Sequence, residues 1–550
     1  MKKRFFIPLC LLTCSLISGL AFAACEESED TGLQQTEYQA QDGENGKSAY
    51  ELYKEKYGYN GTEDEWLEAL VNGELAETVQ HTVTFQPDNG EEDFTQQIQH
   101  GEKAERPEQP ERDGYIFNGW IYDDGVEEET WSFNGYSITK DITLTAKWDY
   151  LTYELPIINI DTQGASINSK VEYTDMTFSL ENCDDELSEI TGGIRLRGNS
   201  TRTYPKKPYR IKFDKKQSLF GLEKAKSWVL LAEYLDPSAL HNYTAFSLAN
   251  EMPGLAFTPS PHKVNVYLNG NFAGLYTLCE QVQENEGRMN IELDEITEDM
   301  VDLKDFNFFI CMDKSVLEDS DSVLDETYFY LEEYDRYFEL KYPEKDQFVS
   351  EEQFESFFAQ LKEYVSDIMY AFKNKDVETI KREANLNSLI DYLIIDQIMG
   401  EYDHSWKSFN MYYTNTSTPE ENGKLNFGPI WDYDWALHTT FTGKPNQEYD
   451  LSDQISYSNV FFQAMANVPE FYGMIKERYT LYASNALGNY IEQIDDIVAS
   501  MDESVKLNEE LWYSSIEEED LSQNNIDFLI AWLEHRKELL DEKWLLTDEE

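Results

Sequence analysis

The chain of 550 residues has few basic side chains for its length. Only 44 lysines and arginines stand against 107 aspartates and glutamates, which gives a formal net charge of −63. A protein that binds nucleic acid needs a basic surface to neutralise the phosphates. The composition therefore excludes general nucleic-acid binding.

Cysteine is also scarce, with six residues in the whole chain. Three of them lie within the first 25 residues, which leaves Cys183, Cys279 and Cys311. An odd number without any Cys-x-x-Cys spacing argues against a disulfide framework and against a zinc site. We interpret these three residues as buried thiols.

Apolar and aromatic residues, in contrast, are plentiful. Hydrophobic residues make up 41% of the chain, and they include 36 tyrosines, 30 phenylalanines and 11 tryptophans. That content supplies enough apolar surface for buried cores, so the chain as a whole is not disordered. At roughly 150 residues per domain, its length predicts three or four domains.

The first 24 residues have the features of a secretion signal. Three basic residues precede an uncharged, apolar run over residues 5–24, the order found in export signals. A membrane-spanning helix is the alternative. The run ends in Leu20-Ala-Phe-Ala-Ala-Cys25, which resembles a lipobox and implies a lipoprotein modified at Cys25. Cleavage after Ala23 without lipidation is the other outcome.

We therefore expect an exported protein at the cell membrane or the cell surface. The polar residues 25–46 follow as a flexible linker. Over residues 47–78, aromatic residues and leucines recur at helical spacing, and Thr62 with Glu65 forms a capping box. This pattern predicts a short helical hairpin. It is similar to a motif of exported bacterial surface proteins and is interpreted as a spacer.

Residues 79–149 have the alternation of β-strands. Ile142-Thr-Leu-Thr-Ala146 alternates, and Asn89-Gly90 is typical of a hairpin turn. Further marks of the segment are Gly114-Tyr-Ile-Phe117, Gly119-Trp120 and Ala146-Lys-Trp148. Together they resemble an InlB B-repeat. The resemblance implies a small β-grasp-like module of bacterial surface proteins that has no catalytic activity.

Residues 150–550 form the bulk of the chain. Strand-like sequence opens this part at Leu155-Pro-Ile-Ile-Asn-Ile160, and the second half contains amphipathic helices. The apolar face of one helix consists of Phe354, Phe357, Phe358, Leu361 and Val365. We predict an α+β fold with two lobes, a β-rich N-terminal half and a helical C-terminal half.

Basic residues concentrate at one place in this acidic chain. Residues 195–212 contain Arg195, Arg197, Arg202, Lys206, Lys207, Arg210 and Lys212. Such an island attracts an anion, and phosphate matches both the arginine fork and the lysine point charge. The segment Gly198-Asn-Ser200 would let backbone N–H groups approach a phosphate closely. The alternative is that these cations only neutralise neighbouring acids.

Carboxylates gather at three later places. Glu280 shares the apolar face of a strand, where a lysine of the basic island could pair with it. The sequence is equally compatible with Glu280 on an edge strand in contact with solvent. Asp403 and Asn410 lie between a helix and a strand, where a general base can stand beside a metal ligand. Asp432 and Asp434 face the same way and repel each other unless a divalent cation or a shared proton intervenes. Their oxygens suit Mg²⁺ or Mn²⁺, with solvated acids as the alternative.

Five blocks of sequence carry a resemblance to a known family. In chain order they are RGNSTRTYPKKPYRIKF, SWVLLAEYLDPSALHN, NGNFAGLYTLCEQV, EYDHSWKSFNMYY and GPIWDYDWAL. They resemble the CotH family of atypical protein kinases over residues 155–540. The resemblance implies a kinase-like two-lobe fold, ATP, and Mg²⁺ or Mn²⁺.

The resemblance also implies roles for single residues. Lys207 would be the phosphate-binding lysine, with Lys206 and Lys212 as the other candidates. Arg197, Asn199 and Ser200 would form the rest of the phosphate site. Glu280 would orient the lysine, and Asp403 would be the catalytic aspartate. The metal would be held by Asp432 and Asp434, with support from Asn410.

Two functions of different classes follow. The first is an exported, membrane-anchored kinase that transfers the γ-phosphate of ATP to Ser or Thr of surface or secreted proteins, with basic substrates favoured by the acidic surface. The second is a surface adhesin or binding protein whose kinase-like domain is a silent scaffold. A glycosidase is disfavoured, because Asp432 and Asp434 are too close in sequence to flank a glycosidic bond at about 5–9 Å.

Overall fold

The fold is described from a computed structural model, in which the chain forms two compact units, Met1–Leu75 and Ala76–Glu550. The described residues are 48–57, 59–72, 80–107, 109–110, 112, 115–123, 128–133, 135–150, 155–285, 287–293, 295–314, 326–415, 418, 421–438, 459–516 and 520–546. The predicted secretion signal, Cys25 and the predicted linker 25–46 lie outside them. No helix in these ranges has the length and apolarity needed to cross a membrane.

The described part of the first unit forms the helices α2 (Ala49–Tyr57) and α3 (Glu63–Asn72). The backbone N–H of Thr62 donates to Glu65 Oε2 at 2.6 Å, and the N–H of Glu65 donates to Thr62 Oγ1 at 3.3 Å. This is the capping box that the sequence predicts. The ring of Trp66 lies 5.9 Å from the rings of both Tyr50 and Tyr53, between centroids. These aromatic contacts join the two helices into the predicted hairpin.

A five-stranded sheet of order β2-β1-β5-β3-β4 opens the second unit. Its strands are β1 (Gln80–Gln86), β2 (Phe94–Gln99), β3 (Tyr115–Asp123), β4 (Glu128–Thr130) and β5 (Ile142–Tyr150). Strands β1 and β2 are antiparallel around the predicted Asn89-Gly90 turn, where Gly90 has a φ of 95°. Alternate residues of the strands, Val83, Phe85 and Leu144 among them, form the buried core, as the period of two predicts.

Seven further strands close into a barrel of order β10-β12-β11-β6-β7-β8-β9. They are β6 (Ile157–Asp161), β7 (Thr174–Glu181), β8 (Leu187–Leu196), β9 (Tyr209–Gln217), β10 (Ala225–Leu231), β11 (His262–Leu268) and β12 (Asn271–Glu280). The core of the barrel includes Phe178, Ile211 and Trp228. In the first half of β9, Tyr209, Ile211 and Phe213 point into this core, so Arg210 and Lys212 between them face outward.

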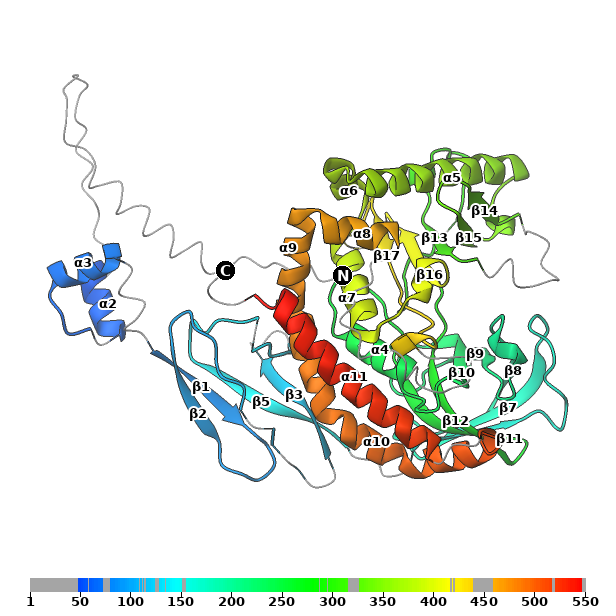
Figure 1. Ribbon diagram of the computed structural model, residues 1–550, viewed down its shortest axis with the longest axis horizontal. Coiled ribbons are helices and arrows are strands. Elements are labelled where there is room, and N and C mark those ends of the chain that lie inside the picture. Colours follow the sequence, from blue (N-terminus) through cyan, green and yellow to red (C-terminus); the bar gives the residue numbers. More distant parts are fainter. Residues whose placement is uncertain are drawn as a thin grey trace, which may run out of the picture. The chain divides into compact units, whose positions relative to one another are not determined.

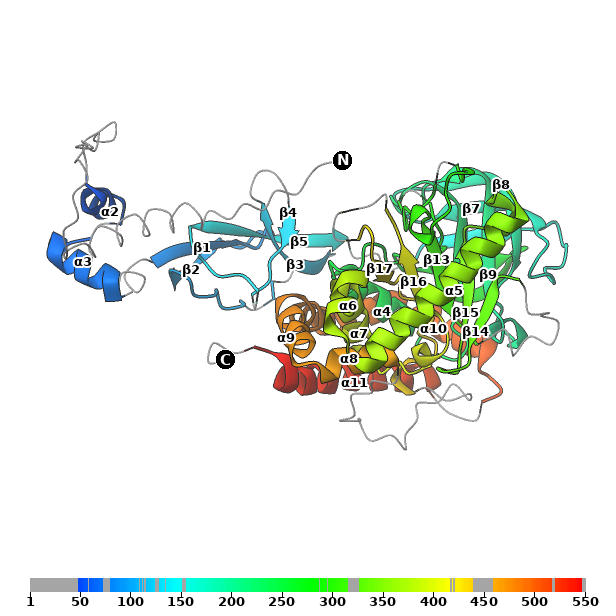
Figure 2. The same cartoon turned by 90° about the horizontal axis from the view of Figure 1, so that it is seen from above.

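The helical lobe contains a third sheet of order β14-β15-β13-β16-β17. Its strands are β13 (Phe308–Met312), β14 (Tyr328–Leu331), β15 (Arg336–Tyr342), β16 (Phe409–Tyr413) and β17 (Leu425–Phe427). Helix α5 (Glu351–Asn374) covers this sheet (Figures 1 and 2), because Phe357 and Phe358 contact Phe308 and Phe329. The predicted α+β class is confirmed. The helical periodicity of the second half did not predict this sheet.

The remaining helices complete this lobe. They are α4 (His241–Asn250), α6 (Val377–Glu383), α7 (Leu386–Met399), α8 (Val460–Asn467), α9 (Pro469–Arg478), α10 (Ser484–Trp512) and α11 (Leu521–Trp544). The long helices α10 and α11 lie side by side (Figure 1). Helix α7 runs through the middle of the lobe, and nearly all of its residues are buried. Such a helix can carry polar side chains only where partners satisfy them.

Candidate active site

A cavity of about 420 Å³ is lined from both lobes. The barrel side contributes Arg197, Asn199, Ser200, Lys206, Arg210 and Glu233, and the helical lobe contributes Asp403, Lys407, Asn410, Trp431, Asp432 and Asp434. Every predicted site residue of the described chain lines this cavity except Lys207, Lys212 and Glu280. The cavity therefore brings together most of the residues that the sequence singles out.

Lys206 and Lys207 are neighbours in sequence but lie in different surroundings. The ammonium of Lys206 donates to the carbonyl oxygen of Leu275 and lies 4.6 Å from the centroid of the Tyr276 ring. Lys207 instead donates to the carbonyl oxygens of Arg202, at 2.9 Å, and of Tyr204. The structure thus places Lys206, and not the predicted Lys207, at the cavity.

The alternation of the chain explains this choice. Pro208 and Arg210 line the cavity like Lys206, whereas Tyr209 and Ile211 belong to the barrel core. The period of two that governs β9 therefore already holds in the residues before it. Lys212 is exposed and lies 6.0 Å over the ring of Tyr173, so it too is not at the cavity.

Burial changes the protonation of Lys206. Its side chain is almost inaccessible, with 1% of the residue exposed, and burial lowers its pKa to about 7 although Glu233 opposes this shift. No ion pair of Lys206 is found within the described ranges. A buried ammonium that is bonded to a carbonyl oxygen and packed on an aromatic ring can gain an anionic partner.

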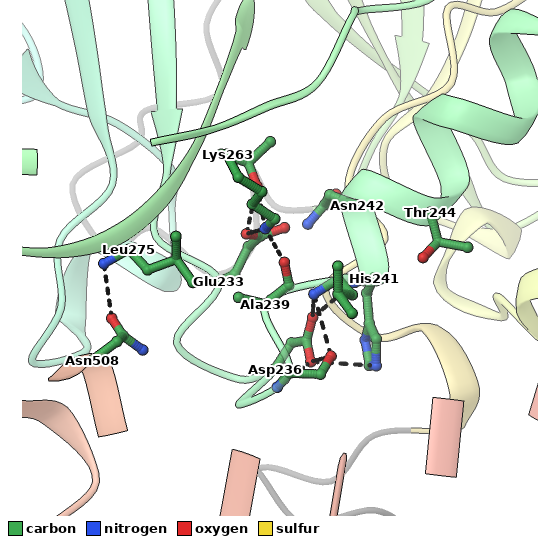
Figure 3. A network of polar contacts seen from close by, with 12 residues as sticks. Glu233, Asp236, Ala239, His241, Asn242, Thr244, Lys263, Leu275 and Asn508 are labelled. Atoms are coloured by element: carbon green, nitrogen blue, oxygen red, sulfur yellow. Dashed lines mark hydrogen bonds and ion pairs between the residues drawn. The ribbon is translucent and has the colours of Figure 1, made fainter. Parts of the chain in front are cut away.

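Glu233 is a carboxylate of the cavity that the sequence did not single out. Figure 3 shows it bonded to Lys263, whose ammonium lies 2.9 Å from Glu233 Oε2 and also donates to Thr277 Oγ1 at 2.6 Å. Glu233 Oε1 is buried without a hydrogen-bond partner, and the residue lines the cavity. The sequence signal for it was a single glutamate two residues after the end of the apolar strand β10.

Glu280 lies elsewhere. Its Oε2 accepts the backbone N–H of Ser260 at 2.7 Å, and burial raises its pKa against the effect of Ser260 and Arg288. On β12 it pairs with Trp228 of β10. The expected pairing of Glu280 with a cavity lysine is therefore not seen among the described residues, and the cavity glutamate Glu233 pairs with Lys263.

The loop after β8 supplies an arginine and backbone N–H groups. The guanidinium of Arg197 lies 4.9 Å over the ring of Trp431. Burial lowers the pKa of Arg197, and the charges of Asp432 and Asp434 oppose that shift. Gly198 has a φ of 78°, and a Cβ there would lie 2.0 Å from Thr201 Oγ1. Only glycine fits this turn, which brings Asn199 and Ser200 to the cavity.

Asp403 begins the short helical turn Asp403–Ser405 at the cavity. Its Oδ1 accepts the indole N–H of Trp406 at 3.1 Å, and its backbone N–H donates to Glu401 Oε1 at 2.6 Å. Burial raises the pKa of Asp403, Lys407 lowers it and Asp432 raises it further. Burial also raises the pKa of Glu401 to about 8. A half-buried carboxylate of this kind can accept a proton from a hydroxyl group.

Asp432 and Asp434 both line the cavity, while Tyr433 between them is buried in the core. This is the common orientation that the i, i+2 spacing predicts. Ser408 Oγ donates to Asp432 Oδ2 at 2.9 Å, and Asn242 Nδ2 donates to Asp434 Oδ1 at 2.6 Å. Burial and the neighbouring Asp432 raise the pKa of Asp434 to about 8. Two such carboxylates are a natural site for a cation.

Two neighbours complete this wall of the cavity. Asn410 on β16 is buried, and its Nδ2 donates to the carbonyl oxygen of Pro429 at 2.9 Å, which fixes its amide beside the cavity. Asn242 Oδ1 accepts the backbone N–H of Tyr433 at 2.9 Å. Asn242 lies in the first turn of α4, which Asp236 caps by accepting the N–H groups of Leu240 and His241, both at 2.8 Å (Figure 3).

Parts of this chain are similar to known families and proteins. The family described as Listeria-Bacteroides repeat domain matches residues 81–147, within the module predicted over 79–149. A Helicobacter pylori proinflammatory kinase, CtkA, aligns with 70% of this chain and 95% of its own at 13% identity, with a TM-score of only 0.23.

Two proteins of Evansella cellulosilytica share short stretches with the chain. Their names describe them as membrane proteins, one of them Gly-rich. They are 30% identical over 93 residues and 34% identical over 92 residues, in each case 17% of this chain. The matches span 10% and 13% of the length of these relatives, respectively.

The family described as CotH kinase protein matches residues 194–540, which is more than half of the chain and contains the whole cavity. The five sequence blocks and the cavity residues that they supply lie within that match. On this evidence the chain belongs to the CotH kinase family.

Proposed function

We propose that this chain is a protein kinase that transfers the γ-phosphate of ATP to a Ser or Thr hydroxyl of a surface or secreted protein, with Mg²⁺ or Mn²⁺. The observation that carries this proposal is one cavity with cations on the barrel side, of which Lys206 is buried, and half-buried carboxylates on the opposite side. Phosphoryl transfer needs both, because the phosphates must be held and their charge neutralised without covalent chemistry by the protein.

The barrel side fits the phosphates of a nucleotide. Lys206 is a buried cation and Arg197 a half-buried cation at the cavity, and Arg210 Nε is buried there without a hydrogen-bond partner. The backbone N–H groups of Gly198, Asn199 and Ser200, which line the cavity, would be further donors to a phosphate. Lys206 and Arg197 would hold the phosphates and stabilise the charge that develops on them.

The opposite side fits a divalent cation. Asp432 and Asp434 would hold it, supported by the amide of Asn410, and the bound ion would neutralise phosphate charge. Among the described residues no group of three or more His, Cys, Asp or Glu side chains is arranged to hold a metal. Two carboxylates suit Mg²⁺ nevertheless, because this ion usually keeps waters and substrate phosphates among its ligands.

Asp403 is the residue that we propose as general base. Its carboxylate would accept the proton of the substrate hydroxyl, while the indole of Trp406 and the N–H bond to Glu401 hold it in place. Its raised pKa makes it a better proton acceptor than an exposed aspartate. A positioned base of this kind contributes about 10²–10⁴-fold to the rate.

Incubation of the protein with radiolabelled ATP and Mg²⁺ or Mn²⁺ tests this function. We expect labelling of a Ser/Thr protein that is lost in Asp403→Ala and Asp432→Ala. Equal labelling by wild type and variants would refute the proposal. A nucleotide at 100 times its Kd should raise the free energy of unfolding by about 2.7 kcal/mol and so raise the melting temperature. The absence of both labelling and this rise would favour the alternative function, a surface binding protein with a silent kinase scaffold.

We also propose that the protein is exported and anchored to the membrane by a lipid at Cys25. The charged and apolar segments of residues 1–24 and the lipobox-like sequence support this. Replacement of Cys25 by serine should release the protein from the membrane fraction. Retention of the variant in the membrane would contradict lipid anchoring.

Basic proteins are the substrates that we propose. The net charge of −63 gives the chain a negative field that attracts basic partners. Lys/Arg-rich serine peptides should be phosphorylated with a lower KM than acidic ones, and the difference should shrink at high salt. An equal KM for both peptide classes would contradict this.

A further inference from the structure

His404 connects the two loops that carry the acidic side of the cavity. Its Nε2 lies 2.7 Å from the carbonyl oxygen of Trp431, the residue before Asp432. A carbonyl oxygen only accepts, so Nε2 must carry a hydrogen. His404 itself directly follows Asp403 in the chain. One imidazole ring thus ties the turn of the proposed base to the loop of the proposed metal ligands.

The other nitrogen of His404 is held by Asp396 on helix α7. Nδ1 lies 2.9 Å from Asp396 Oδ1 and 3.0 Å from Oδ2. The hydroxyl of Tyr433 donates to the same Oδ1 at 2.7 Å. All three side chains are essentially inaccessible, with at most 1% of each residue exposed. Asp396 therefore fixes the residue after the base and the residue between Asp432 and Asp434.

The charge of this cluster is consistent with a fixed ion pair. Burial is the largest single influence on the pKa of His404 and lowers it, but Asp396, Glu401 and the carbonyl oxygen of Trp431 together raise it to about 10. Burial raises the pKa of Asp396, and His404 and Tyr433 oppose that rise. Removing one partner of a buried pair leaves the other uncompensated, so the three groups depend on one another.

A second buried aspartate on α7 offers a comparison. Asp391 is as inaccessible as Asp396, and it pairs with Arg478 at 2.6 Å and accepts the N–H of Gly254 at 2.7 Å. Neither of these partners lies in the turn of Asp403 or in the loop of Asp432 and Asp434. Asp391 thus joins α7 to Arg478 and Gly254, away from the acidic loops. Asp396 instead joins α7 to His404 and Tyr433 in those loops.

We propose that His404 is a positioning residue, held by Asp396 and supported by Tyr433, that sets the distance and orientation of Asp403 relative to Asp432 and Asp434. The proposal rests on the proposed function, because it assigns a role in metal and hydroxyl placement. It adds to that function three residues that touch neither nucleotide nor substrate. Their effect is indirect, through the two loops that they join.

The test compares His404→Gln with the matched control Asp391→Asn. Glutamine keeps one donor but cannot bond to Trp431 and Asp396 as the ring does. We expect His404→Gln to lower kcat at least tenfold and to raise the Mg²⁺ concentration for half-maximal transfer several-fold, while the KM for ATP at saturating Mg²⁺ changes less than twofold. Asp391→Asn should lower the melting temperature and leave the Mg²⁺ requirement unchanged.

Tyr433→Phe keeps the test decisive if His404→Gln does not fold. It removes only the hydroxyl that donates to Asp396, and we expect a smaller rise in the Mg²⁺ requirement, about two- to threefold. A Mg²⁺ requirement that is unchanged in the folded His404→Gln variant overturns the proposal. If that variant does not fold, an unchanged requirement in Tyr433→Phe overturns it. An equal rise in Asp391→Asn would show a general loss of stability instead and would also overturn it.

A second readout separates this proposal from the proposed function. The binding of Mn²⁺ to the folded proteins in the presence of ATP can be measured by electron paramagnetic resonance. This measurement does not depend on phosphate transfer. Wild-type protein that binds Mn²⁺ but transfers no phosphate would refute the kinase function, and weaker binding by His404→Gln would still support the positioning role. If wild-type protein binds no Mn²⁺, both proposals fail.

Discussion

The two walls of the cavity are built in different ways. On the barrel side, Lys206, Pro208 and Arg210 follow the alternation of a strand, which places two of the cations, Lys206 and Arg210. On the opposite side, the acids stand on irregular backbone, where Ser408 and Asp432 have φ values of 51° and 71°. Such conformations persist only where surrounding contacts enforce them. The cation wall thus depends on strand register, and the acid wall depends on side-chain bonds from α4 and α7.

The largest expected effect separates two acids of the same wall. Asp403→Asn and Asp432→Asn should each lower phosphate transfer about a thousandfold, because one removes the base and the other a metal ligand. Only Asp432→Asn should also lose the Mg²⁺-dependent rise in melting temperature with ATP. Transfer assays and thermal melting with and without Mg²⁺ check both. If Asp432→Asn kept that rise, Asp432 would not be a metal ligand.

The next effect contrasts two adjacent lysines of the cation wall. Lys206→Met should lower transfer about a hundredfold, as loss of one donor to developing charge does. Lys207→Met should lower it less than tenfold, because this ammonium bonds to carbonyl oxygens of its own loop. Melting temperatures of both variants serve as the control for loss of folding. We expect little loss of stability, because replacement of a buried charge by an apolar side chain often leaves stability unchanged or raises it. A larger loss in Lys207→Met would return the phosphate role to that residue.

A smaller effect tests the turn that carries Asn199 and Ser200. Gly198→Ala combines a φ of 78° with a Cβ that meets Thr201 Oγ1, and it should weaken ATP binding about tenfold, or 1.4 kcal/mol. Gly164→Ala is the matched control, because Gly164 has a φ of 80° and open space around its Cβ position. Calorimetry should find the affinity of that control unchanged. Equal weakening in both variants would show a general effect of backbone strain.

The smallest effect concerns pH and the buried Lys206. Its folded pKa of about 7 lies below the ordinary value of 10.5, so the unfolded chain binds more protons between pH 7 and 10.5. The contribution of Lys206 to stability therefore rises with pH in this window and is lost as pH falls through 7. Relative to Lys206→Met, the free energy of unfolding of wild type should rise by about 1 kcal/mol from pH 7 to 8. Denaturant titrations without nucleotide measure this, and a difference independent of pH would contradict it.

Much of the candidate site could be predicted from the sequence, and particular residues show where prediction stopped. Asp403, Asp432 and Asp434 stand out because acids between aromatic residues have no local structural purpose, and all three line the cavity. The family resemblance implied Lys207 as the phosphate-binding lysine, whereas Lys206 lines the cavity, because a motif does not show which of two adjacent lysines points into it. Glu233 and His404 were missed, because their partners Lys263 and Asp396 are meaningful only once the chain is folded.

The sequence by itself determined the α+β class, the capping box at Thr62, the repeat over residues 81–147 and the membership of residues 194–540 in the CotH kinase family. These features depend on local periodicity and on contiguous motifs. They can be recognised without knowing which distant segments are in contact. Only the tertiary structure decided which lysine and which glutamate line the cavity, and how Asp396 joins the two acidic loops. The physical reason is that burial and pairing between segments far apart in the chain set the positions and charges of these groups.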